Sequence, residues 1–161
     1  MTLRTGIATS AALIALAGTL AGCGGSGAKS SANSSGRSLA SANLTAAKRQ
    51  IERTWSAFFS GSTPAAEKAR LLQNGARFAP VIRAQANSPL AQRTKATVAS
   101  VTLQGPSRAK VVYTITVAGQ PALKHQIGTA VRIDGTWRVS DRSFCGLLSL
   151  QGSAPPLCPH A

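Results

Sequence analysis

The spacing of apolar residues changes near Pro89, and this change limits the folds open to the chain. Before Pro89, apolar residues recur every three or four positions, as in an amphipathic helix. After it, they alternate with polar residues, as in a half-buried strand. Helices followed by a run of antiparallel strands predict an α+β domain in which helices cover one face of the sheet. The 161 residues are enough for one such domain.

About three helices are expected before the strands, over residues 43–60, 64–73 and 78–86. Gly61 ends the first helix, whose apolar stripe contains Leu44, Ala47, Ile51, Trp55, Phe58 and Phe59. Thr63 is the predicted N-cap of the second helix, because proline in the next position suits the first helical turn. Asn74-Gly75 favours a left-handed end to that helix.

About four strands are expected, over residues 97–103, 109–117, 123–133 and 136–139. Thr97, Ala99, Val101 and Leu103 are expected on one face of the first strand. In the third strand, alternation puts His125 on the same face as Leu123 and Ile127, the face expected to point inward. Asp134-Gly135 is the strongest local signal, since this dipeptide between strand residues is typical of a two-residue type I′ hairpin.

The first 23 residues have the layout of a bacterial lipoprotein signal. Arg4 precedes a short apolar run, and Leu20-Ala21-Gly22-Cys23 resembles a lipobox. The run of about 14 residues is too short for a spanning helix, which needs roughly 20. An ordinary secretion signal would need no cysteine after Leu-Ala-Gly. We therefore expect residues 1–22 to be removed and Cys23 to be acylated, which anchors the protein on the extracytoplasmic face of the cell membrane.

Residues 24–42 are almost entirely glycine, serine and alanine. Such a segment buries too little apolar surface to offset its ordering entropy, so a flexible tether is expected, with a root-mean-square reach of roughly 25 Å. The expected organisation is a signal peptide at 1–22, an acylated Cys23 with its tether at 23–42, and a folded domain at 43–161.

The chain carries 18 Lys and Arg against four Asp and Glu, a formal charge of +14. Such a charge attracts polyanions over long range and weakens with salt. Outside the cytoplasmic membrane the expected partners are anionic headgroups or anionic envelope polymers, and nucleic acid is not expected. The basic residues form no dense run, so a solvated basic surface without a specific partner is an equal alternative.

Cys145 and Cys158 remain as a pair once Cys23 is assigned to lipid. In an oxidising compartment an even pair predicts a disulfide. A loop of about 14 residues closed in this way contributes roughly 3 kcal/mol. We expect the bridge to tie the C-terminus to the last strand. A metal or catalytic thiol is the alternative, but the chain has no CxxC or Cys/His cluster, so no metal or cofactor is expected.

Several motifs occur in an order that resembles the low-molecular-weight antigen family of actinobacterial secreted proteins and lipoproteins. They are TWSAFF at 54–59, LLQNG at 71–75, VVYTI at 111–115, IDGTWRVS at 133–140 and FCGLL at 144–148, followed by Pro155, Pro156 and Cys158. The resemblance covers most of residues 43–158. It implies a cone-like fold, similar to nuclear transport factor 2 and cystatin-like domains, whose curved antiparallel sheet wraps the helices. It supplies no catalytic motif.

An enzyme is the alternative reading of such a cone, since related cones host isomerases and dehydratases with an acid or base in the cavity. The candidates are Tyr113, His125 and Asp141. The chain has only two histidines and four acids, and a single inward histidine is more often a hydrogen-bonded core residue. The sequence therefore favours no catalysis.

Two non-catalytic hypotheses remain for this surface lipoprotein of the cell envelope. In one, the cone holds an apolar envelope ligand in a pocket lined by some of Trp55, Phe59, Tyr113, His125, Ile127 and Trp137. In the other, the pocket is packed shut and the basic surface mediates contacts. Because the chain has only seven aromatic residues, most are needed for core packing, Trp55 and Trp137 above all.

Overall fold

A computed structural model describes the backbone of residues 31–152 and 154–158, and side chains from Leu39 onward. The predicted signal peptide (1–22), the predicted acylation site Cys23 and residues 24–30 of the predicted tether lie outside the described residues.

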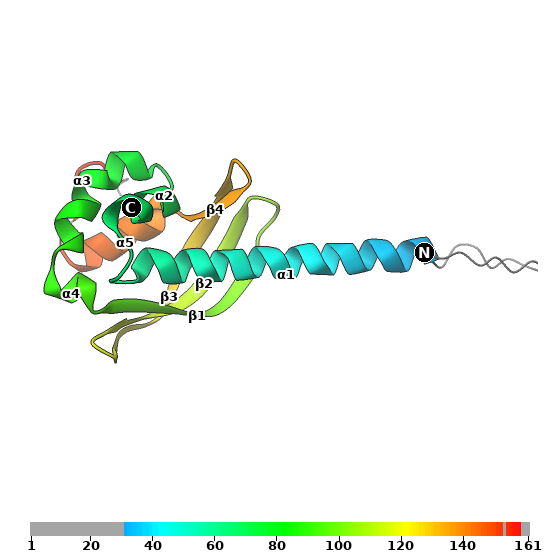
Figure 1. Ribbon diagram of the computed structural model, residues 1–161, viewed down its shortest axis with the longest axis horizontal. Coiled ribbons are helices and arrows are strands. Elements are labelled where there is room, and N and C mark those ends of the chain that lie inside the picture. Colours follow the sequence, from blue (N-terminus) through cyan, green and yellow to red (C-terminus); the bar gives the residue numbers. More distant parts are fainter. Residues whose placement is uncertain (1–30, 153, 159–161) are drawn as a thin grey trace, which may run out of the picture.

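The described chain forms four helices, four strands and a final helix. In order these are α1 (Ser31–Phe59), α2 (Ala65–Leu71), α3 (Gly75–Ala86), α4 (Pro89–Gln92), β1 (Thr94–Leu103), β2 (Arg108–Val117), β3 (Gln120–Ile133), β4 (Thr136–Val139) and α5 (Asp141–Leu150). The strands make one antiparallel sheet in the order β1-β2-β3-β4. Figure 1 shows the sheet curling around part of α1, with the shorter helices gathered at one end. The predicted α+β class with a curved antiparallel sheet is confirmed.

Helix α1 begins at Ser31 rather than at Asn43, so residues 31–42 differ from the expected flexible tether. Three alanines and Leu39 in this stretch favour a helix, whereas its serines and Gly36 do not, so we attribute the extension mainly to the fact that lengthening a formed helix needs no new nucleation. Only the C-terminal part of α1 packs on the sheet, where Ile51 and Trp55 are fully buried, whereas Leu39 is 67% exposed. The N-terminal part of α1 extends beyond the sheet (Figure 1).

Irregular pairing bends the sheet. The β1–β2 register shifts between Val98 and Ser100, so Ala96 and Val101 are both buried. The face predicted for this strand is therefore wrong at its start, where Thr97 and Ala99 are exposed. A bulge inserts one residue and reverses the alternation, which periodicity cannot detect. Two further shifts occur between β2 and β3.

From His125 to Ala130 the inward face of β3 is also opposite to the predicted one, whereas Leu123 is half-buried and packs against the core as predicted. Gly128 and Ala130 are buried, while Ile127 is 72% exposed and His125 is exposed with a φ of 52°. A Cβ atom at Gly128 would lie 2.6 Å from Cζ2 of Trp55. The indole ring of α1 thus occupies the space where an inward side chain of β3 would lie at Gly128, and the neighbouring Ile127 faces outward.

Helix α5 was not expected. The Oγ of Ser140 accepts a hydrogen bond from the backbone N–H of Ser143 at 3.1 Å and caps its first turn. The disulfide between Cys145 and Cys158, with Cα atoms 5.5 Å apart, ties the C-terminal segment to this helix. The bridge was expected to reach the last strand instead. Gly152, Pro155 and Pro156, which disfavour regular structure, all follow α5 in the chain.

Replacing Gly128 by alanine should destabilise the fold by about 1–3 kcal/mol, because the new methyl group would overlap the Trp55 ring. Urea unfolding followed by circular dichroism measures the change. Gly146→Ala is the matched control: a Cβ there meets nothing within 4 Å, and alanine in α5 should stabilise by about 0.5–1 kcal/mol. Equal stability of Gly128→Ala and the parent chain would contradict the predicted packing.

Candidate functional site

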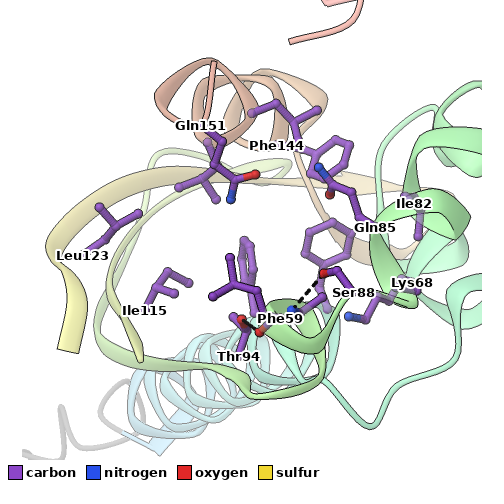
Figure 2. Close-up of a pocket in the computed structure, with 16 residues that line it drawn as sticks. Phe59, Lys68, Ile82, Gln85, Ser88, Thr94, Ile115, Leu123, Phe144 and Gln151 are labelled. Atoms are coloured by element: carbon purple, nitrogen blue, oxygen red, sulfur yellow. Dashed lines mark hydrogen bonds between the residues drawn. The ribbon is translucent and has the colours of Figure 1, made fainter. Parts of the chain in front are cut away.

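A cavity of about 170 Å³ lies between the clustered helices and the sheet. It is lined by Phe58, Phe59, Lys68, Ile82, Gln85, Ala86, Ser88, Leu90, Ala91, Thr94, Ile115, Leu123, Phe144, Leu147, Leu148 and Gln151. Figure 2 shows Leu123 and Ile115 on one side of this space, Lys68 and Gln85 on the opposite side, and Gln151 above it. All five helices and three of the four strands contribute to the lining, so the cavity depends on the complete tertiary fold.

Aromatic rings form part of the cavity wall and continue from it into the core. Phe58 meets Phe144 of α5 edge to face, with ring centroids 5.6 Å apart. Phe59 stacks on Tyr113 of β2 at 5.6 Å, and Tyr113 in turn contacts Trp55 at 5.5 Å. This chain of ring contacts joins α1, β2 and α5, and fixes one wall of the cavity.

Two of the polar lining residues hold the short helix α4. The Oγ of Ser88 accepts a hydrogen bond from the N–H of Ala91 at 3.1 Å, and the hydroxyl of Thr94 donates to the carbonyl of Leu90 at 2.8 Å. The remaining polar lining groups include the ammonium of Lys68 and the side-chain amides of Gln85 and Gln151. Burial lowers the pKa of Lys68 from its ordinary value.

The six residues predicted to line a pocket do not come together as a set. Phe59 alone among them lines the cavity. Trp55, Tyr113 and Trp137 are buried in the core, as core packing of the aromatics would require. His125 and Ile127 are exposed on the outer face of β3, because the alternation of that strand is reversed.

The candidate acid and base residues lie in different surroundings. Tyr113 is buried among aromatic rings, and burial raises its pKa to about 12. Asp141 accepts a hydrogen bond from the side-chain amide of Asn74 at 2.8 Å, and His125 is exposed. Within the part of the chain that the structure describes, no three His, Cys, Asp or Glu side chains are grouped as metal ligands would be.

Neither the polar lining residues nor α5 was expected from the sequence. Ser140 followed by Asp141 was a usable signal, since serine favours the N-cap and an acid favours the first turn. Phe144, Leu147 and Leu148 then have helical spacing. No comparable signal marks Lys68, Gln85 or Gln151, because each lies on a short helix or at a helix end whose position depends on tertiary packing.

The fold and the cavity define an α+β domain with a helix-lined space beside a curled antiparallel sheet. The chain belongs to the family described as "Low molecular weight antigen MTB12, C-terminal domain", whose profile matches residues 43–155. The family resemblance drawn from the motifs is thereby confirmed, and every cavity-lining residue lies inside the matched region. No match was found among curated proteins or among solved structures.

None of the helices among the described residues has both the length and the apolar composition needed to cross a bilayer.

The buried phenol gives a direct test of the ring cluster. Tyr113 is the single tyrosine of the chain, so tyrosinate absorbance reports on it alone. Because burial favours the neutral phenol, the folded protein should titrate near pH 12 and the unfolded chain near pH 10. The phenol's contribution to stability is complete below pH 10 and is lost as the pH rises to 12.

Tyr113→Phe is the control and should show no such absorbance change. A midpoint near pH 10 in the folded protein would mean that the ring is accessible to water and that the cavity wall is not built as described.

Proposed function

We propose that this protein is a non-catalytic binding protein of the cell envelope, anchored to the membrane through acylated Cys23, which holds a small apolar ligand in the cavity. The cavity is the observation that carries the proposal, because nine of its lining side chains are large and apolar: Phe58, Phe59, Ile82, Leu90, Ile115, Leu123, Phe144, Leu147 and Leu148. Small-molecule sites are typically apolar spaces with a few polar groups that orient the ligand.

The cavity volume limits the ligand. At about 30 Å³ for each water-sized group, 170 Å³ accommodates roughly six non-hydrogen atoms, and a cavity of similar size is known to hold benzene. Six buried methylene groups give about 5 kcal/mol of transfer free energy, part of which is lost to the entropy of association. The expected affinity for a ligand of this size is therefore modest, and a longer ligand would place only one end inside.

Membership of an antigen family supports a role at the cell surface. The lipobox at Leu20-Ala21-Gly22-Cys23 supports attachment there, and the charge of +14, which falls to +13 when Arg4 leaves with the signal, supports contact with anionic headgroups or envelope polymers rather than nucleic acid. In this proposal the acyl chains hold the protein at the extracytoplasmic face, and the basic surface adds an attraction that salt weakens.

A variant that fills the cavity should abolish ligand retention. Native mass spectrometry of the protein purified from its own envelope, before and after organic extraction, should show a discrete extractable mass. Ala86→Phe should remove this mass, because Ala86 lines the cavity. Ala84→Phe places the same residue at an exposed position of α3 and should retain it. Ligand binding would be refuted if the parent protein showed only the mass of the ligand-free chain, both as purified and after incubation with envelope lipids.

Cys23→Ala should move the protein from the membrane fraction to the soluble fraction, since the acyl chains are lost. Fractionation is done in high salt, which screens attraction between the basic surface and anionic lipids. Cys145→Ala combined with Cys158→Ala is the control, because it removes the disulfide and leaves Cys23 in place. Membrane association of Cys23→Ala in high salt would rule out the lipid anchor.

A further inference from the structure

We infer that the cavity selects a monoanionic carboxylate with a short apolar body, whose carboxylate pairs with the ammonium of Lys68. This inference rests on the proposed function, which makes the cavity a ligand site, and it adds the chemical class of the ligand and the residue that recognises it.

Backbone hydrogen bonds in and just after α2 fix the position of Lys68. Its N–H donates to the carbonyl of Pro64 at 3.0 Å in the first turn of α2. Just after α2, Leu72 is fully buried and pairs with Val139 of β4, and the N–H of Gln73 donates to the carbonyl of Val139 at 2.8 Å. The helix that carries Lys68 is therefore fastened to the sheet, and Figure 2 shows the side chain with its nitrogen directed into the space between the lining residues.

The acidic residues of the described chain all lie outside the cavity that Lys68 lines. Glu52 and Glu67 are exposed, Asp134 lies in the β3–β4 turn, and Asp141 accepts from Asn74. None of them lines the cavity. Burial is the cause of the lowered pKa of Lys68, with no neighbouring carboxylate acting to raise it. A half-buried ammonium beside apolar side chains is stabilised when an anion pairs with it.

The single positive charge of the Lys68 ammonium favours a ligand with a single negative charge. One ammonium neutralises one carboxylate, whereas a phosphate monoester, with up to two charges, would bring uncompensated charge into an apolar space. The side-chain amides of Gln85 and Gln151 also line the cavity and can donate hydrogen bonds to a carboxylate oxygen. Since the cavity takes roughly six non-hydrogen atoms, a carboxylate leaves room among Phe58, Phe59, Ile115 and Leu123 for about three carbon atoms of the apolar body, and a longer body extends out of the cavity.

A charge series on one apolar body tests the inference. Hexanoate, hexan-1-ol and hexylamine are titrated into the full chain carrying Cys23→Ala, and binding is followed by two-dimensional NMR. Hexanoate should bind at least about tenfold more tightly than hexan-1-ol, and hexylamine should bind most weakly. Lys68→Met, which keeps an unbranched side chain and removes the charge, should make hexanoate and hexan-1-ol bind with equal affinity.

Lys48→Met is the matched control, because it makes the same change in net charge at an exposed position of α1. It should leave the preference for hexanoate unchanged. Equal affinity of the parent chain for hexanoate and hexan-1-ol, or an unchanged preference in Lys68→Met, would overturn the role of Lys68 while leaving the cavity as an apolar binding site. Binding of none of the three probes would overturn the ligand site itself, and the inference with it.

Discussion

The packing of Trp55 against β3 is the contact on which the rest of the domain depends. The indole ring lies so close to Gly128 that no side chain fits there, and it also contacts Tyr113 of β2. One residue earlier, the hydroxyl of Thr54 donates to the carbonyl of Trp137 at 3.3 Å. A single turn of α1 thereby contacts three strands, and the bulged, curved sheet is the form that allows this contact.

The cavity exists because contacts among the surrounding elements fix their positions. Phe58 and Phe78 both meet Phe144 of α5 edge to face, and the disulfide joins α5 to the C-terminal segment. Hydrogen bonds of Ser88 and Thr94 hold α4 on the other side. With their positions set in this way, the short helices enclose a space instead of collapsing into it, and Lys68 can direct a charge inward.

The sequence predicted those features that arise from local patterns. The switch of apolar spacing at Pro89, the Asp134-Gly135 turn and the even cysteine pair led to the α+β class, the four strands and the disulfide. The inward face of β3 could not be predicted, because its buried residues are small and make room for a ring 73 positions earlier in the chain (Trp55 to Gly128). A pocket was hypothesised from the sequence, but Phe59 is the single predicted residue that lines the cavity, because the lining comes from residues that only the tertiary fold brings together.

The length of α1 has a consequence for how the domain would stand on a membrane. The residues from Ser31 to about Leu44 continue the helix beyond the sheet and span roughly 20 Å at 1.5 Å per residue. With an anchor at Cys23, this section would act as a stiff helical spacer that is continuous with the buried turn carrying Trp55. Any tilt of this helical section would therefore turn the cavity together with it.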